Sequence, residues 1–412
     1  MKKILYLGDY VARTGFGTVS HNIIREVKKH YREELQLDII AINYFGDTYY
    51  EDERTCVVSA VKNDVKQDSY GRFFFLKMLK EGDYDGVFIC QDIGIIQPLI
   101  EVMEVIKREK KESNQKQFKS IFYFPVDCEM VEQLTKGIEF FDVIATYTEY
   151  GREVILKYRP ELKTKIHVVP HGNNPKDFYP LEKSERESFR KEFFGENASK
   201  FIITNVNRNQ PRKDIPTTIL AFQELKEIWN GTLYDLPEPF LYLHMHPRDP
   251  KGWDLRLIFS QTNLKEDVDY KLLPPQWELA GCETDVLNKI YNASDVMLTT
   301  SVSEGWGLTV SEAAACKIPI IAPMHTSFSE MLGYGSRGYV IEDTFQCCHN
   351  IDSFIRFQVD YNDVADMIKR VAIDKRLKSA ILSQKVDAAY EWSQKLQWSI
   401  VCKRWIEYFK IF

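Results

Sequence analysis

The sequence predicts an α/β protein with two doubly wound domains, each built on a parallel sheet that helices cover on both faces. Short apolar runs of strand length alternate with helical patterns along both halves of the chain, which is typical of parallel strands joined by crossover helices. The length of 412 residues also exceeds the roughly 100–200 residues of one usual domain. A polar, charged segment at 180–200 separates the two halves.

The first half begins with an apolar run at 4–7, a loop that carries Gly15 and Gly17, and a helical pattern at about 18–30. Its further strand candidates are 37–42, 87–90, 120–124, 142–146 and 166–169. The segment HGNNPKDFYP is rich in Pro, Gly and Asn, which end regular structure. We therefore expect residues 1–179 to form the first domain.

The second half repeats the plan with strand candidates at 201–205, 240–245, 296–300, 318–322 and 339–341. Helical patterns cover 215–229, 284–292, 309–316 and the stretch from 364 onward. We expect residues 180–391 to form the second domain. The aromatic stretch 392–412 is expected to be a helix that packs back on the first domain. Ligands are expected in a cleft between the domains, at the carboxyl ends of the strands.

Composition excludes several classes of protein. Apolar residues make up 44% of the chain and aromatic residues 13%, which indicates a folded globular protein. The net charge of −6 argues against a broad basic surface, so no nucleic-acid partner is expected. The eight cysteines do not form paired CxxC motifs. Reduced thiols without a zinc site are therefore expected.

The N-terminal letters MKKILYLGDY contain an apolar stretch, 4–7, that is too short for a signal peptide. No run approaches the ~20 apolar residues of a membrane span. We therefore expect a soluble, cytoplasmic protein without a transmembrane segment, with peripheral membrane contact left open.

The most informative segment is 291–332, which reads YNASDVMLTTSVSEGWGLTVSEAAACKIPIIAPMHTSFSEML. An apolar run is followed by a turn with two glycines and then by a helical pattern from Thr309. Such a turn forms an anion site, because free N–H groups and the helix dipole point at one place. Glu304 and Glu312 flank that place. Phosphate-binding backbone beside carboxylates that bind hydroxyls is what a sugar nucleotide requires.

Motifs in and around this segment carry a family resemblance. YNASDVMLTTS, the glutamate pair in EGWGLTVSE and the letters EAAACKIPIIA resemble motifs of glycosyltransferase family 4. NRNQPRKDI is similar to the Arg-to-Lys phosphate clamp of that family, and VVPHGNNPKDF to its interdomain turn. The resemblance implies the GT-B fold, in which two Rossmann-like domains face each other across a cleft and the second binds the donor.

The resemblance also implies roles for single residues. Glu304 would bind the donor sugar and stabilise positive charge at the anomeric carbon, and Glu312 would bind the ribose hydroxyls. Arg208 and Lys213 would neutralise the diphosphate, which otherwise needs a divalent metal, so no metal site is expected. The other donor-site candidates are the glycines of the first loop and the turn before the helix: Gly15, Gly17, Gly305, Trp306, Gly307, Leu308 and Thr309.

Some residues depart from the family pattern. Asp127 stands where members often have a histidine near the reacting sugar, and it is included among the catalytic candidates. Lys317 and Asp214 occupy positions that glycine usually holds. These departures leave the acceptor side open.

Several candidates also have a structural interpretation. Thr309 and Glu312 fit a capping box, in which the two side chains cap the helix start. Arg212 is expected to be solvated. Gly15 and Gly17 would begin a dinucleotide fingerprint, but the third glycine position holds Ser20, so NAD is not expected.

The resemblance therefore implies a retaining, metal-independent glycosyltransferase that needs no cofactor. It would move a hexose from a GDP- or UDP-linked donor to a glycan, lipid-linked or protein acceptor, and family habit favours a GDP-mannose-like donor. The alternatives are a catalytically silent GT-B module that binds a nucleotide, and a sugar-nucleotide epimerase or phosphorylase on the same fold.

Overall fold

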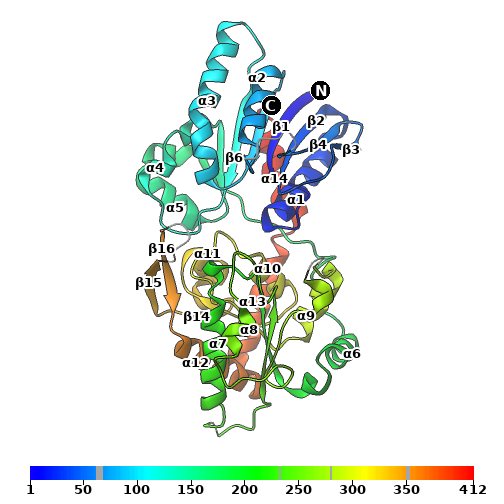
Figure 1. The fold of residues 1–412 in the computed structure, drawn as a ribbon, viewed down its shortest axis with the longest axis vertical. Coiled ribbons are helices and arrows are strands. Elements are labelled where there is room, and N and C mark those ends of the chain that lie inside the picture. Colours follow the sequence, from blue (N-terminus) through cyan, green and yellow to red (C-terminus); the bar gives the residue numbers. More distant parts are fainter. Residues whose placement is uncertain (62–67, 232, 279–280, 349–352) are drawn as a thin grey trace. The chain divides into compact units, whose positions relative to one another are not determined.

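The structure is a computed structural model that describes residues 1–61, 68–231, 233–278, 281–348 and 353–412 (Figure 1). The chain divides into two compact units. The first comprises Met1–Val126, Met130–Gly172 and Trp398–Phe412, and the second comprises Asp127–Glu129 and Asn173–Gln397. The main boundaries thus follow Gly172 and Gln397, where the sequence placed them after residues 179 and 391.

The first unit is built on an eight-stranded sheet with the order β3-β4-β2-β1-β5-β6-β7-β8. All neighbouring strands are parallel except β3 and β4. Strands β3 and β4 were missing from the sequence-based interpretation. The strands are β1 (Lys2–Asp9), β2 (Leu35–Ile42), β3 (Tyr49–Asp52), β4 (Thr55–Ser59), β5 (Gly86–Cys90), β6 (Lys119–Phe124), β7 (Val143–Thr146) and β8 (Ile166–Val168).

The helices of this unit are α1 (Gly15–Tyr31), α2 (Arg72–Glu81), α3 (Ile93–Glu112), α4 (Glu132–Thr135), α5 (Glu149–Tyr158) and α14 (Trp398–Phe409). Helix α14 comes from the C-terminal end of the chain and packs on α1. Its Trp405 is fully buried and contacts Phe88 of β5 at 5.3 Å between ring centroids. The last helix therefore completes the core of the first unit.

The second unit contains a parallel sheet with the order β11-β10-β9-β12-β13-β14 and a separate antiparallel hairpin, β15-β16. The strands are β9 (Phe201–Val206), β10 (Pro239–His244), β11 (Tyr270–Lys271), β12 (Val296–Leu298), β13 (Ile320–Pro323), β14 (Tyr339–Ile341), β15 (Thr344–Cys348) and β16 (Ile355–Val359). The hairpin was not predicted from the sequence.

The helices of the second unit are α6 (Lys183–Phe194), α7 (Ile215–Ile228), α8 (Leu255–Phe259), α9 (Thr284–Ala293), α10 (Leu308–Ala315), α11 (Thr326–Met331), α12 (Tyr361–Arg376) and α13 (Ala380–Gln394). In each sheet the chain proceeds outward in both directions from a central strand, β1 or β9, which is the doubly wound topology. The predicted α/β class is confirmed. In the described part of the chain, every helix is too short or too polar to cross a membrane.

Candidate functional site

Two loops of the second unit meet where neighbouring parallel strands end. Strand β9 pairs with β12 through Val296 opposite Ile203 and Met297 opposite Thr204. The carboxyl ends of parallel strands lie at the same edge of a sheet, so the loop after β9 and the loop after β12 face one another. The first loop ends in a short 3-10 helix, Pro211–Lys213, and the second carries Glu304. The sheet thus brings Lys213 and Glu304 together from positions 91 residues apart.

Glu304 is the centre of a buried ion-pair network. The Lys213 ammonium donates a hydrogen bond to Glu304 Oε2, and Arg212 Nη1 donates to the same oxygen at 3.0 Å. Arg212 Nη1 also donates to the carbonyl of Ser303 at 3.2 Å. Glu304 and Lys213 are each 8% exposed. Two cations therefore share one carboxylate at the end of the sheet.

The pKa values show that this network is ionised near neutral pH. Burial alone would raise the pKa of Glu304, but the charges of Arg212 and Lys213 outweigh it and hold that pKa at about 2. Burial lowers the pKa of Lys213 to about 8, and the Glu304 carboxylate limits the shift. Lys213 is therefore a charged group held close to its titration point.

The prediction that Arg212 is solvated is wrong, because its side chain is half-buried against Glu304. Arg208 takes the exposed position instead: its side chain is 56% exposed, and its Nε lies 3.0 Å from Asp249 Oδ2. Lys213 thus has Arg212, and not Arg208, as its neighbour on Glu304. The clamp of Arg208 and Lys213 stays a prediction about a ligand-bound protein.

The turn after Glu304 leads into helix α10 as expected, but a side chain does not cap the helix. The N-cap residue is Gly307, at φ 104, a conformation that favours glycine. A Cβ atom there would lie 2.9 Å from the Phe328 ring. The capping box of Thr309 and Glu312 is contradicted, since Thr309 lies within the helix. The first-turn N–H groups, at Leu308 and Thr309, lack intrahelical acceptors, and such groups are suited to bind an anion.

Glu312 makes a different contact from the predicted cap. Its Oε2 accepts a hydrogen bond from the Tyr291 hydroxyl at 2.8 Å. Burial raises the pKa of Glu312 to about 7, although the Tyr291 hydrogen bond opposes the shift. Its carboxylate can therefore be ionised or protonated near neutral pH, depending on what binds to it.

The start of helix α11 holds the turn in place, which the sequence did not reveal. Thr326 Oγ1 accepts a hydrogen bond from the Glu304 N–H at 3.3 Å, and Ser327 Oγ donates to the Trp306 carbonyl at 2.8 Å. The Trp306 ring is buried and stacks near Trp392 at 6.1 Å between centroids. Trp306 and the adjacent Gly305 can therefore offer backbone groups to a ligand while the Trp306 ring serves the core.

The remaining candidates are Asp127, Gly15 and Gly17. Asp127 belongs to the segment Asp127–Glu129 of the second unit, and its charge is one cause that raises the pKa of Lys213. Gly15 and Gly17 lie in the first unit, in the first turn of α1, so the expected loop is helical. Thr14 caps this turn by accepting from the Gly17 N–H at 3.0 Å. A Cβ at position 17 would lie 2.0 Å from the Ala12 carbonyl oxygen. This clash is a local steric reason for glycine at position 17.

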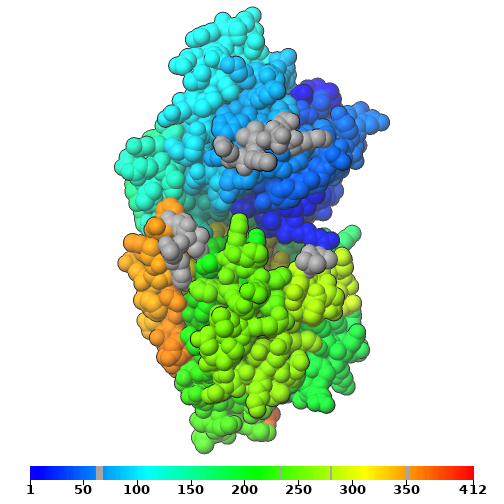
Figure 2. Space-filling model, viewed as in Figure 1, coloured from blue at the N-terminus to red at the C-terminus, as the bar shows by residue number. Residues whose placement is uncertain are grey.

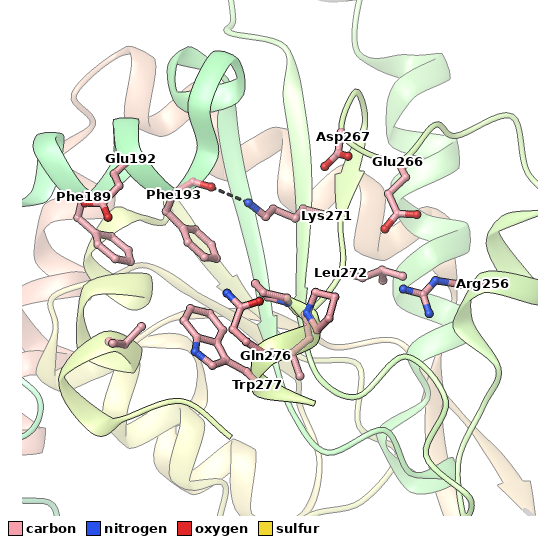
Figure 3. A pocket seen from close by; sticks show the side chains of 14 residues that line it. Phe189, Glu192, Phe193, Arg256, Glu266, Asp267, Lys271, Leu272, Gln276 and Trp277 are labelled. Atoms are coloured by element: carbon pink, nitrogen blue, oxygen red, sulfur yellow. Dashed lines mark hydrogen bonds between the residues drawn. The ribbon is translucent and has the colours of Figure 1, made fainter. Parts of the chain in front are cut away.

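A separate hollow of about 540 Å³ opens on the second unit, and Figure 3 shows the side chains that line it. Phe193 and Trp277 stack at 5.8 Å between centroids, and Lys271 donates to the Phe193 carbonyl at 2.7 Å. The predicted donor-site residues are not part of its lining. Among the described residues, His, Cys, Asp and Glu side chains do not gather in threes that could hold a metal ion.

Comparison with known proteins finds similarity to glycosyltransferases in the second half of the chain. The family model "Glycosyl transferases group 1" matches residues 260–371, which include Glu304 and Glu312. Trehalose synthase of Pyrococcus horikoshii is 30% identical over 221 residues, which are 52% of this chain and 51% of that protein. These findings support a GT-B glycosyltransferase family for the matched part of the chain.

A second curated relative shows similarity of the same extent. A probable sucrose-phosphate synthase of Thermosipho melanesiensis is 27% identical over 243 residues, which are 57% of this chain and 51% of that protein. The chain spans about half the length of these curated relatives, 51% of each.

Solved structures confirm the predicted GT-B fold over the whole chain. Sucrose-phosphate synthase from Thermosynechococcus elongatus has a TM-score of 0.72 at 16% identity, covering 100% of this chain and 98% of that one. HepE of Anabaena, solved with UDP and glucose, has a TM-score of 0.66 at 14% identity and full coverage of both chains, 100% and 100%. At these identities the likeness shows the fold.

Proposed function

We propose that this protein is a retaining glycosyltransferase that transfers a hexose from a nucleoside-diphosphate sugar to an acceptor hydroxyl without a metal ion. The observation that carries the proposal is the buried network of Lys213, Arg212 and Glu304 beside the open first turn of α10. A paired cation cluster next to free helix N–H groups suits a diphosphate, and a carboxylate at the same place suits a sugar.

In this proposal the donor diphosphate replaces the Glu304 carboxylate as the partner of the Lys213 ammonium. The Lys213 ammonium pairs with Glu304 in the ligand-free protein. A bound diphosphate would take over that ammonium and leave the Glu304 carboxylate to the sugar. Lys213 then neutralises the charge that develops on the departing diphosphate, which is the role a divalent metal has in other transferases.

The transfer step needs no side-chain nucleophile. The bond from the anomeric carbon to the diphosphate oxygen stretches, and positive charge on the sugar is stabilised by the Glu304 carboxylate. The acceptor oxygen forms its bond on the same face that the diphosphate leaves. Its proton passes to the leaving phosphate oxygen. The products are a nucleoside diphosphate and a glycoside with the donor's anomeric configuration.

The donor is proposed to be a UDP- or GDP-linked hexose. The family resemblance favoured a GDP-mannose-like donor, whereas HepE was solved with UDP-glucose, and a trehalose-6-phosphate protein of E. coli was solved with UDP-2-fluoro glucose. UDP-linked and GDP-linked hexoses should therefore both be tested first as donors. Glu312, with its hydroxyl-accepting carboxylate beside Tyr291, is proposed to bind the ribose, which both donors share. The acceptor is proposed to be a glycan, a lipid-linked glycan or a protein.

The test is the release of nucleoside diphosphate from UDP- and GDP-hexoses in EDTA, with and without candidate acceptors. We expect one donor to give release that an acceptor stimulates and that EDTA leaves unchanged. A silent nucleotide-binding module would be stabilised by nucleotide but release none. A metal-dependent enzyme would lose its activity in EDTA.

Donor affinity is expected to show a maximum between pH 7 and 8. Ionised Glu312, with a pKa of about 7, accepts from the ribose, so affinity rises as pH rises through 7. Charged Lys213, with a pKa of about 8, holds the diphosphate, so affinity falls as pH rises above 8. Affinity at pH 6 and at pH 9 should each be roughly tenfold below the maximum.

Titration calorimetry with an intact sugar nucleotide measures this profile, because its doubly esterified diphosphate does not titrate in the range. Glu312→Gln should remove the decline on the acid side. Lys213→Arg should remove the decline on the alkaline side, since a guanidinium stays charged. A flat profile in the unmodified protein would contradict both roles.

A further inference from the structure

The hairpin β15–β16 contacts both loops that carry the ion-pair network. Its strand β16 runs beside the loop after β12, where the Phe357 N–H donates to the Val302 carbonyl at 3.1 Å. In Figure 1 the hairpin lies at one side of the second unit, and in Figure 2 the orange segment that includes it reaches the surface. Phe345 and Ile355 are accordingly 49% and 53% exposed. The hairpin thus has a solvent side and a side against the loops.

One contact reaches the loop of Lys213 through the next residue. Asp214 has φ 46 and ψ 50, a left-handed conformation that is strained for most residues other than glycine. Gln358 Nε2 donates to Asp214 Oδ2 at 2.8 Å and to Thr217 Oγ1 at 3.2 Å. Thr300 Oγ1 donates to the Asp214 carbonyl at 2.9 Å. The hairpin therefore holds Asp214 through its side chain, at a position where glycine would adopt the backbone conformation more easily.

A second contact reaches the loop of Glu304. Arg356 is 4% exposed, and its Nε donates to Ser303 Oγ at 2.9 Å. Ser303 directly precedes Glu304. Arg356 and Gln358 are two positions apart on β16, so their side chains leave the strand on the same face. One face of one strand therefore holds the residue after Lys213 and the residue before Glu304.

We propose that the hairpin β15–β16 is a positioning element for the donor site, and that Gln358 and Arg356 set the distance between Lys213 and Glu304. The proposal rests on the proposed function, because the site it positions is the donor site. It also explains why aspartate stands at position 214, because its carboxylate accepts a hydrogen bond from Gln358 and glycine has no such acceptor. The Lys213 ammonium and the Glu304 carboxylate are then presented to diphosphate and sugar at a fixed separation.

Two substitutions at Asp214 separate positioning from folding. Glycine adopts the left-handed conformation without strain but lacks the acceptor, whereas asparagine tolerates the conformation and keeps one. Asp214→Gly should therefore retain or raise the melting temperature and raise the donor KM about tenfold, with a smaller fall in kcat. Asp214→Asn should keep a donor KM near that of the unmodified protein.

The hairpin itself provides a second pair of variants. Gln358→Leu removes the donor to Asp214 and should change the donor KM as Asp214→Gly does. Gln346→Leu makes the same chemical change at an exposed position of β15 and should have no effect. The double variant Asp214→Gly with Gln358→Leu should be no worse than Gln358→Leu alone, because that change already removes the hydrogen bond to Asp214.

The measurement is donor KM and kcat for the five variants beside melting temperature. The proposal is overturned if Asp214→Gly and Gln358→Leu both keep a normal KM, or if Asp214→Asn fails as Asp214→Gly does. It is also overturned if the changes in KM merely follow losses of melting temperature. An unmodified protein that releases no nucleoside diphosphate refutes the proposed function first, and the assignment of the hairpin then falls with it.

Discussion

Replacing Glu304 with glutamine should lower the transfer rate by about 10³-fold, the loss expected when one electrostatic partner of a transition state is removed. Nucleoside diphosphate affinity should stay within about threefold at pH 6.5. In the unmodified protein, Lys213 exchanges one charge-assisted hydrogen bond, to Glu304, for another, to phosphate. In the variant, Lys213 no longer has to leave a carboxylate when it binds phosphate. Burial lowers the pKa of Lys213, and the Glu304 carboxylate opposes this shift, so the variant should have a lower Lys213 pKa than the unmodified protein. The slightly acid pH keeps the ammonium charged.

Glu227→Gln is the matched control, since Glu227 is an exposed glutamate on α7 and should tolerate the change. Rates and nucleotide affinities are measured on the same preparations, with melting temperature as a check of folding. Normal turnover by Glu304→Gln would show that the reacting sugar lies elsewhere. A collapse of nucleotide affinity together with the rate would assign Glu304 to the fold of the loop.

Replacing Lys213 with alanine should reduce nucleoside diphosphate affinity about 10–100-fold, the equivalent of one hydrogen bond to a charged group. The transfer rate should fall further, since charge on the departing diphosphate is greatest in the transition state. Arg212 remains to pair with Glu304 at 3.0 Å, so the carboxylate is not left as an isolated buried charge.

Lys191→Ala provides the control at an exposed lysine of α6. Lys213→Met keeps the length of the side chain and separates loss of charge from loss of packing. If both Lys213 variants bind nucleotide as the unmodified protein does, the diphosphate is not held by this ammonium. If alanine weakens binding and methionine does not, packing rather than charge is responsible.

The repeated strand and helix patterns were sufficient to predict both parallel sheets, because buried strands read as continuous apolar runs. The strands at 49–59 and the hairpin at 344–359 were missed. The first pair is short and partly exposed at the sheet edge, and the hairpin has polar and apolar residues mixed on both strands. The second strand of the hairpin, IRFQV, does alternate apolar and polar residues as a half-buried strand would, and this signal was overlooked.

The candidate site was predicted in part for a similar reason. The glutamates and the turn lie on one continuous segment, so their spacing was readable. The choice between Arg208 and Arg212 depends on which side chain the loop 207–214 turns inward, and that is decided by Glu304 and Ser303 from another part of the chain. The roles of Thr326 and Gln358 depend likewise on residues distant in sequence.

The most direct test of the central claim is an experimental structure of the protein with an intact sugar nucleotide, prepared in EDTA. The account predicts a diphosphate oxygen about 2.8 Å from Lys213 Nζ, a typical charge-assisted hydrogen-bond length, beside the first turn of α10. The Glu304 carboxylate should lie on the sugar. A nucleotide bound elsewhere, or one still distant from Lys213 while Glu304 keeps both cations, would contradict it.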